Sequence, residues 1–256
     1  MEPESIEHLQ EFVEDEDARK IFAKVFDERV VQTLSKLADK GLFEVVEFVI
    51  STGKEAHVFR ARTPSGDYVA VKIYKIETSD FRHMDRYVRG DRRFEGVKHS
   101  KRDLVYAWAR KEFKNLERAV EAGVPVPLPL GFKENVLVME FIGDNGKAAP
   151  PLHDTKLPAY REAYEMVVDW VARLFYKAEL VHADLSEYNV LVQGAGTAEG
   201  KLRLIDIGQA VLRTHPQVEA FFRRDCENVS RFFSRWGVKK SADDVWADVK
   251  EAGEGM

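Results

Sequence analysis

The sequence contains very little cysteine and no long apolar segment. Its 256 residues include a single cysteine, Cys226, which has no partner for a disulfide within the chain or for a CxxC metal or redox site. We therefore expect Cys226 to be a buried thiol of a protein in a reducing compartment. No apolar run approaches the roughly 20 residues of a membrane-spanning helix, and the acidic N-terminus does not resemble a signal peptide. These absences predict a cytoplasmic protein with no membrane contact.

Lysine and arginine are absent from residues 1–17, which contain eight acidic residues. The balance is reversed in residues 82–102, which contain eight Lys or Arg and three acids, although the whole chain has a net charge of −5. One interpretation is that both segments are solvated flanks and loops. The other is that the basic segment binds a polyanion such as RNA. In that case the acidic leader either shields the basic segment or extends away from it. The sequence alone leaves both interpretations open.

The first half of the chain predicts a helix followed by a small antiparallel sheet. Apolar residues at helical spacing up to Leu37, with Gly41 where a C-terminal cap belongs, predict a helix over residues 17–39. Strand-like runs are found at residues 42–50, 57–62 and 68–74, and they are joined by turns at 51–56 and 64–67. Residues 75–101 show no regular spacing of apolar residues, which predicts a mobile loop with a helical turn near 81–87.

A second helix begins at Arg102, and its apolar stripe includes one acid. The stripe consists of Val105, Trp108, Ala109, Glu112 and Leu116. A buried carboxylate needs a partner, because leaving it unpaired costs several kcal/mol. Lys72, on the central strand of the predicted sheet, is the natural candidate.

The next segments predict a boundary between two lobes. Gly123 ends the second helix, residues 124–127 run extended because of their prolines, and a hairpin follows from 131 to 142. Gly143–Gly146 and the Pro150–Pro151 pair then break the pattern. We therefore predict three parts: residues 1–41 as leader and packing helix, 42–143 as the N-terminal lobe with a basic loop at 75–101, and 144–256 as the C-terminal lobe.

The C-terminal lobe is predicted to be mainly helical. A long core-facing helix contains Ala163, Val167, Trp170, Val171, Leu174 and Ala178, and short strands are expected at 190–192 and 202–205. The last strong helix contains Val218, Phe221, Phe222, Val229, Phe232, Phe233 and Trp236. Asp225 lies at i,i+4 spacing between Phe221 and Val229, so it should also face inward.

Three polar residues follow the long helix in a recognisable order. His182, Asp184 and Asn189 fit H-x-D-x-x-x-x-N, and a second apolar run ends in Ile205-Asp206. Enzymes of the protein-kinase type use this arrangement for a base and two magnesium ligands. The alternative is that these side chains merely cap turns, but this would leave Asp206 and the order of the motifs unexplained.

Four motifs in order resemble the RIO family of atypical serine/threonine protein kinases, in its type-one branch. They are STGKEA (Ser51 to Ala56), VAVK ending at Lys72, VHADLSEYNVLV (Val181 to Val192) and IDIGQA (Ile205 to Ala210). The resemblance covers about residues 45 to 236. It implies an α+β, two-lobed kinase-like fold, in which the N-terminal lobe is an antiparallel sheet with one helix. The C-terminal lobe would be mainly helical and truncated after the metal-binding loop.

The resemblance also implies a set of site residues. The nucleotide would be bound by Ser51, Thr52, Gly53, Lys54, Glu55, Ala56, Lys72, Glu112, Met139, Glu140, Ile142 and Glu187. Lys72 and Asp184 would be catalytic, Asn189 and Asp206 would hold the metal, and Asp206 could become an aspartyl-phosphate during ATP hydrolysis. Backbone groups of Glu140 and Ile142 would contact adenine, and Asp225 would anchor the catalytic-loop backbone.

The chain departs from ordinary protein kinases in three ways. Ala183 replaces the arginine that usually reads a phosphorylated activation loop, and Ile207 takes the place of the phenylalanine in D-F-G. No A-P-E sequence follows, and about 50 residues remain after Asp206, which is short for the usual peptide-docking helices. A peptide substrate would therefore have little of the normal platform.

The leading hypothesis is a monomeric kinase or ATPase that uses ATP with Mg²⁺, or with Mn²⁺ in its place. The resemblance implies that it acts on the pre-ribosomal small subunit, through rRNA and proteins. One alternative is a small-molecule phosphotransferase of the aminoglycoside or choline kinase kind, which has a similar H-x-D-x-x-x-x-N. Another is a nucleotide-gated module that binds rRNA or a partner with little catalysis.

Overall fold

The computed structural model describes residues 27–76, 87–88, 90–97, 100–197 and 200–256. The chain forms two compact units, and each is assembled from three stretches of sequence. The first unit contains Met1–Asp85, Arg93–Phe113 and Leu128–Phe141, and the second contains Arg86–Arg92, Lys114–Pro127 and Ile142–Met256.

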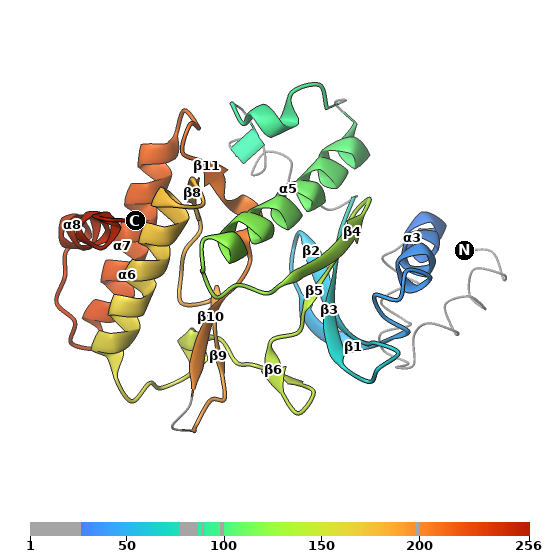
Figure 1. Ribbon diagram of the computed structural model, residues 1–256, viewed down its shortest axis with the longest axis horizontal. Helices are drawn as coiled ribbons and strands as arrows, with labels where there is room; N and C mark the ends of the chain where they lie inside the picture. The colour runs from blue at the N-terminus through green and yellow to red at the C-terminus, as the bar shows by residue number, and fades with distance from the viewer. Residues whose placement is uncertain (1–26, 77–86, 89, 98–99, 198–199) are drawn as a thin grey trace. The chain divides into compact units, whose positions relative to one another are not determined.

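The first unit is built on a five-stranded antiparallel sheet (Figure 1). Its strands are β1 (Val45–Thr52), β2 (Ala56–Arg62), β3 (Tyr68–Tyr74), β4 (Pro129–Lys133) and β5 (Val136–Glu140), in the order β1-β2-β3-β5-β4. The predicted strand over 68–74 is confirmed at both ends. The first strand begins three residues later than expected and continues through Thr52, so the STGKEA segment supplies the ends of two strands as well as a turn.

Helix α3 (Glu28–Ala38) covers one face of this sheet with a stripe of apolar side chains. Val30, Leu34 and Leu37 are at most 3% exposed and belong to the same core as residues of all the strands except β4. The helix begins after Asp27, whose backbone is extended and whose side chain accepts from the N–H of Val30. The predicted continuous helix over 17–39 is therefore wrong at residue 27, because a capping aspartate starts the helix there. Residues 17–26 lie outside the described residues.

Helix α5 (Lys101–Glu121) follows the 3₁₀ turn η1 (Arg92–Phe94) and contributes residues to both units. The predicted stripe is confirmed, since none of its five members is more than 2% exposed. In the first unit Phe113 contacts the ring of Phe132 on β4, with 4.8 Å between ring centroids. The helix ends at Glu121, and Gly123 just beyond it has the left-handed φ of 75° that is typical of a residue after a helix end. Of the loop predicted over 75–101, residues 77–86, 89 and 98–99 lie outside the described residues, and with them all of the helical turn predicted near 81–87 except Tyr87.

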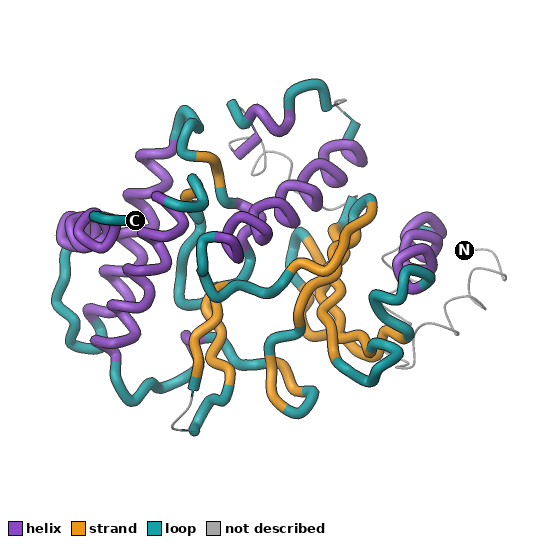
Figure 2. Tube along the Cα trace, viewed as in Figure 1, coloured by secondary structure: helices purple, strands orange, loops and turns teal. Residues whose placement is uncertain are grey.

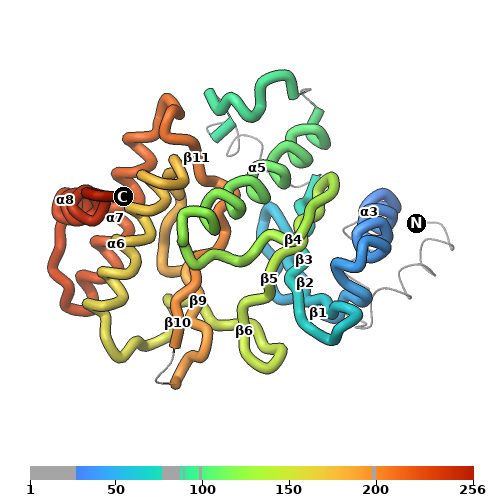
Figure 3. Tube along the Cα trace, in the orientation of Figure 1, coloured from blue at the N-terminus to red at the C-terminus, as the bar shows by residue number. Residues whose placement is uncertain are grey.

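The second unit is mainly helical (Figures 2 and 3). Its helices are α6 (Tyr160–Tyr176), α7 (Val218–Ser234) and α8 (Ala242–Gly253), with 3₁₀ turns η2 (Leu152–Asp154) and η3 (Ile207–Gln209). Three short antiparallel pairs complete it: β6 (Gly143–Asp144) with β7 (Lys147–Ala148), β8 (Leu180–Val181) with β11 (Val211–Leu212), and β9 (Val190–Gln193) with β10 (Lys201–Leu204). Residues 143–146, predicted only as a break, thus form strand β6 and the turn that leads into β7.

The side chains predicted to face the core of the second unit are buried or half-buried, except for Trp236 beyond the end of α7. Asp225 and Cys226 are buried on α7 as expected, at 2% and 1% exposure. Trp236 was predicted to face the core with α7, but it lies beyond the helix and is 43% exposed. It stacks on Tyr160 with 4.4 Å between ring centroids, which covers one face of its ring. None of the described helices is both long and apolar enough to cross a membrane.

Candidate active site

The STGKEA segment forms a tight turn between β1 and β2. The N–H of Gly53 donates to the carbonyl of Ala56 at 2.9 Å, and the ammonium of Lys75 donates to the carbonyl of Gly53 at 2.7 Å. A Cβ atom at Gly53 would lie 3.2 Å from the same Ala56 oxygen, so a larger residue would crowd the turn. Ser51, Thr52, Gly53 and Lys54 are exposed. The turn therefore presents backbone and hydroxyl groups outward, and its binding of phosphates stays a prediction.

Lys72 and Glu112 form the predicted ion pair inside the first unit. The ammonium of Lys72, on β3, lies 2.9 Å from both carboxylate oxygens of Glu112 on α5. The two side chains are only 10% and 1% exposed. Such a bidentate pair fixes the lysine ammonium in one place, where it can serve as a point charge for a phosphate.

The predicted adenine-binding residues lie at the end of β5 and just beyond it. Met139 and Glu140 belong to β5, and the N–H of Glu140 donates to the carbonyl of Leu128 at 2.8 Å. The carbonyl of Ile142 accepts from the N–H of Ala149 at 3.0 Å. The contact of adenine with backbone groups of Glu140 and Ile142 stays a prediction.

Asp184, Asn189 and Asp206 are brought together in the second unit by two hydrogen bonds to backbone carbonyls. The side-chain amide of Asn189 donates to the carbonyl of Asp184 at 2.9 Å. The carbonyl of Asn189 accepts from the N–H of Ile205, also at 2.9 Å, at the end of the β9–β10 ladder. Since Asp206 follows directly, the strand pairing places the predicted base and both predicted metal ligands in one cluster.

The backbone of this cluster is strained at two positions. Ala183 has φ 65° and Asp206 has φ 56°, which are left-handed values that cost a residue with a Cβ about 1 kcal/mol or more. Asp225 counteracts the first strain, because its carboxylate accepts from the N–H groups of Ala183 and Leu185 at 2.7 and 2.9 Å. The predicted anchoring role of Asp225 is confirmed by these two bonds.

Burial changes the pKa values of two groups beneath the cluster. The pKa of His182 is lowered to about 4 because burial disfavours the imidazolium, although Asp206 opposes the change. Its Nε2 lies 3.3 Å from the carbonyl oxygen of Ile205, which can only accept, so Nε2 carries the proton of the neutral ring. Burial raises the pKa of Asp225 to about 7, and the hydrogen bonds from Leu185 and Ala183 limit the rise.

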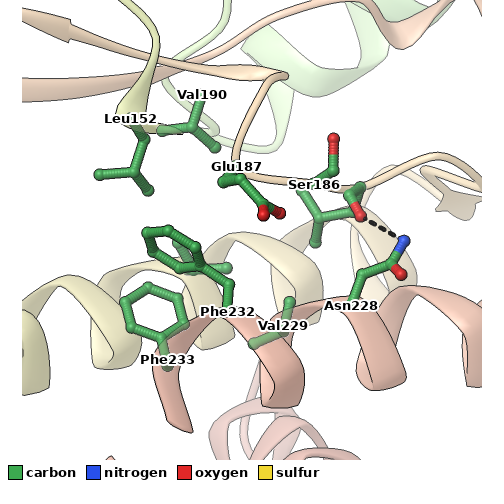
Figure 4. Close-up of a pocket in the computed structure, with 10 residues that line it drawn as sticks. Leu152, Ser186, Glu187, Val190, Asn228, Val229, Phe232 and Phe233 are labelled. Atoms are coloured by element: carbon green, nitrogen blue, oxygen red, sulfur yellow. Dashed lines mark hydrogen bonds between the residues drawn. The ribbon is translucent and has the colours of Figure 1, made fainter. Parts of the chain in front are cut away.

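Glu187, predicted to contact the nucleotide, lines a pocket together with residues of α7. The pocket is lined mainly by apolar side chains, among them Leu152, Val190, Phe232 and Phe233 (Figure 4). The Glu187 side chain is 7% exposed, and its carboxylate lies 3.7 Å from the guanidinium of Arg235. Its backbone carbonyl accepts from the N–H of His153. A contact between Glu187 and nucleotide stays a prediction.

The chemistry of the cluster fits a hard divalent cation. Asn189 and Asp206 supply an amide and a carboxylate, the oxygen ligands that Mg²⁺ prefers. Among the residues that the structure describes, no three His, Cys, Asp or Glu side chains lie close enough to hold a metal. The Mg²⁺ sites of phosphoryl-transfer enzymes take one or two carboxylates and draw their other oxygens from phosphates and water.

Three supporting residues were missed in the sequence. The buried amide of Asn115 donates to the carbonyls of Ile207 and Ala210, at 2.8 and 3.2 Å, and so holds the turn after Asp206. Arg224 and Asn228 donate to the carbonyls of Ala183 and Leu185 respectively. The helical spacing of Asn115 from Glu112, and of Asn228 from Asp225, is i,i+3 and could have identified two of them.

Comparison with protein families gives one match that covers most of the chain. A family model described as the RIO domain matches residues 57–245. The chain is 44% identical over 247 residues to the RIO-type serine/threonine-protein kinase Rio1 of Haloferax volcanii, and covers 83% of that protein. It is 39% identical to its namesake in Methanocaldococcus jannaschii, covering 95% of this chain and 80% of the relative. It is also 39% identical to the human serine/threonine-protein kinase RIO1, but spans only 40% of that longer protein.

Two solved structures from Chaetomium thermophilum have a similar fold. The Rio2 kinase in a complex described as ADP/Mg²⁺-phosphoaspartate aligns with a TM-score of 0.68 at 22% identity, covering 88% of this chain and 66% of that one. Another structure of the same kinase aligns with a TM-score of 0.60 at 21% identity, covering 99% and 86%. At these identities the likeness concerns the fold alone, and it confirms the predicted kinase-like α+β architecture.

Proposed function

The chain belongs to the RIO family of serine/threonine-protein kinases, and from this premise we propose that it transfers the γ-phosphoryl group of ATP through the Asp184 cluster. The observation that carries the proposal is the pair of bonds that tie Asn189 to Asp184 and to Ile205, the neighbour of Asp206, within one unit. A base and two metal ligands in one place are the minimum that phosphoryl transfer of the kinase type requires. Lys72, paired to Glu112, supplies the charge for the α- and β-phosphates.

Each residue of the cluster has a separate task. Asp184 accepts or orients the proton of the attacking hydroxyl. Asn189 and Asp206 hold Mg²⁺, which when bound offsets the negative charge that develops on the phosphates. Mn²⁺ has similar ligand preferences and is proposed as a substitute. Neutral His182 supports the loop from below by its bond to Ile205 and takes no part in proton transfer.

The fate of the phosphoryl group distinguishes a kinase from an ATPase. The Chaetomium relative is described with a phosphoaspartate, and Asp206 is the residue of this chain on which we propose a matching intermediate. The Asp206 carboxylate would displace ADP from the γ-phosphorus, and water would then release phosphate from the acyl phosphate. Direct transfer to a serine or threonine hydroxyl would instead leave a stable phosphoester.

The chemistry of a labelled product tests the proposal. The purified chain is incubated with Mg²⁺ and ATP labelled in its γ-phosphate, and the phosphoprotein is treated with hydroxylamine. Label that hydroxylamine removes and that Asp206→Asn abolishes indicates an aspartyl-phosphate, while resistant label indicates serine or threonine transfer. The absence of both labelled protein and released phosphate would overturn the proposed function. Asp169→Asn, on the surface of α6, is the matched control.

We further propose that the target is a pre-ribosomal small subunit and that the basic segment at 82–102 contacts its RNA. The described part of this segment includes Arg92, which is exposed, and Arg93. Replacing both with alanine should lower the slope of log affinity for single-stranded RNA against log salt by about 0.7 for each phosphate that the variant no longer neutralises. Replacing Lys36 and Lys40, on α3 and just beyond it, gives a control of equal charge. Unchanged slopes in both variants would remove Arg92 and Arg93 from RNA binding.

A small-molecule phosphotransferase is the less favoured alternative, because the matched relatives are named as protein kinases. A nucleotide-gated binding module remains compatible with the kinase proposal, since ATP binding and RNA binding can occur in one protein.

A further inference from the structure

Three neighbouring residues of α7 bind the backbone on both sides of Asp184. Asp225 accepts from the N–H groups of Ala183 and Leu185, and Asn228 donates to the carbonyl of Leu185 at 2.9 Å. Arg224 donates to the carbonyl of Ala183, which belongs to the peptide bond that joins Ala183 to Asp184. The orientation of this peptide, and with it the direction of the Asp184 side chain, therefore depends on Arg224.

The same guanidinium nitrogen has a second acceptor far away in the sequence. It lies 3.2 Å from the hydroxyl of Tyr87, a residue that is only 2% exposed and that belongs to the same unit. The ring of Tyr87 stacks on Phe221, one turn before Arg224 on α7, with 5.1 Å between centroids and 16° between planes. The guanidinium itself lies over the ring of Phe221 at 5.4 Å. Tyr87 thus packs tightly against α7, although the proposed reaction assigns it no role.

We propose that Tyr87 is a positioning residue for catalysis, acting through Arg224 on the Ala183–Asp184 peptide. Ala183 is held at φ 65°, and a strained backbone of this kind persists only where its surroundings fix it. A guanidinium held by the Ala183 carbonyl alone can rotate about its side-chain torsions. The Tyr87 hydroxyl removes this freedom, so the peptide stays in the one orientation that directs Asp184 toward its substrate.

The departure from ordinary kinases at residue 183 supports this role. Their H-R-D sequence places an arginine in the catalytic loop, where it reads a phosphorylated activation loop. In this chain the loop residue is Ala183, and an arginine reaches the loop backbone from α7. Its partner is the buried hydroxyl of Tyr87, so the packing of Tyr87 against α7 is coupled to the catalytic loop.

Tyr87→Phe tests the proposal, because it removes the hydroxyl and keeps the stacking ring. This part of the inference rests on the proposed function: kcat for phosphoryl transfer should fall about tenfold, as expected for loss of a hydrogen bond to a charged group, while KM for ATP is unchanged.

Arg224→Met should lower kcat at least as far, and Tyr87→Phe should add nothing in that background. Arg224→Lys, which keeps one donor, should restore part of the rate. Tyr164→Phe loses a tyrosine bond to Asp248 elsewhere in the same unit and should leave kcat unchanged.

Amide hydrogen exchange provides a readout that does not depend on activity. In Tyr87→Phe the peptide that covers Ala183 and Leu185 should lose protection, while the β9–β10 hairpin keeps it. Wild-type kcat together with wild-type exchange in Tyr87→Phe would overturn the inference, as would additive effects of the Tyr87 and Arg224 variants. If the wild-type chain transfers no phosphate, the proposed function fails, and the exchange comparison still decides whether Tyr87 holds the loop.

Discussion

A lysine and a glutamate that are both nearly inaccessible to water can remain charged only as a pair. Lys72 and Glu112 meet this condition, with both carboxylate oxygens 2.9 Å from the ammonium. The pair contributes little to stability by itself, because taking two charges out of water offsets much of their attraction. The pair matters because it fixes the position of the Lys72 ammonium. Removing Glu112 would leave this ammonium buried without a carboxylate to balance its charge.

Glu112→Gln should therefore destabilise the protein by about 3 kcal/mol and reduce phosphoryl transfer by about 100-fold, because the Lys72 ammonium is no longer held in place. Urea unfolding and transfer of labelled phosphate measure the two effects. Glu117→Gln, further along the same helix, breaks an exposed pair with Lys114 and should change stability by less than about 0.5 kcal/mol. Similar effects of the two variants would contradict the buried-pair account.

His182 introduces a pH dependence of stability. Its pKa falls from 6.5 to about 4 on folding, since burial opposes the charged ring. Between these values the unfolded chain binds a proton that the folded chain refuses, so this contribution is complete above pH 6.5 and is lost as the pH falls toward 4. Asp225 acts in the opposite direction, because its raised pKa of about 7 makes the folded chain bind a proton more tightly than the unfolded one.

His182→Gln isolates the first effect, because glutamine keeps a donor for the Ile205 carbonyl and cannot titrate. The unfolding free energy of the wild type relative to this variant should fall by up to about 3 kcal/mol between pH 6.5 and pH 4. Unfolding by urea at several pH values measures the difference. A difference independent of pH would show that His182 is not buried as a neutral ring.

The residues that were predicted correctly are those whose direction follows from a helical period. Glu112 and Asp225 face inward because each lies in line with apolar neighbours on its helix. Trp236 was predicted wrongly because it lies beyond the end of α7, where the helical period no longer fixes the direction of a side chain. It stacks on Tyr160, a tertiary contact that the sequence does not encode locally.

At the scale of elements, α8 shows how a short helix escapes prediction. It begins with a capping box, in which the Ser241 hydroxyl accepts from the N–H of Asp244 and the Asp244 carboxylate accepts from the N–H of Ser241. Val245 and Val249 bury one stripe, and Trp246 packs edge-on against Phe222 of α7. The S-x-x-D pattern and the i,i+4 valines were present in the sequence, but few other apolar residues accompany them.

Ser241→Ala should destabilise the protein by about 1 kcal/mol and lower its Tm by about 3 °C, because the first turn of α8 loses its cap. Calorimetry measures the shift. Ser234→Ala is the control, since the Ser234 hydroxyl makes only a long contact of 3.5 Å with Val238. An equal shift in both variants would mean that the capping box does not stabilise α8.

Strands and turns of the sheet were predicted more closely than the first helix. The run 68–74 is continuous, and a turn at residues 64–67 precedes it, so its start was well marked. The start of α3 was missed because the apolar period continues upstream of Asp27. A capping aspartate and an ordinary surface aspartate look alike in such a pattern, and only the extended backbone at residue 27 separates them.

At the scale of the molecule, each unit assembles part of the predicted site from distant stretches of sequence. The first unit joins β3 to α5 through Lys72 and Glu112, and the second joins the start of β9 to the end of β10 beside Asp184. Local patterns identified these elements but not the sharing of α5 between units, because periodicity describes neighbours within one element. The division into functional lobes at residue 143 stays a prediction.

The central claim is that Asp184 serves a phosphoryl transfer from ATP, and one measurement tests it most directly. The wild type and Asp184→Ala are incubated with Mg²⁺ and ATP labelled in its γ-phosphate, and labelled protein and released phosphate are counted. We predict that the variant binds ATP as the wild type does but is about 100- to 10,000-fold slower, the usual contribution of a general base. Equal rates in the two proteins, or no turnover in the wild type, would contradict the account.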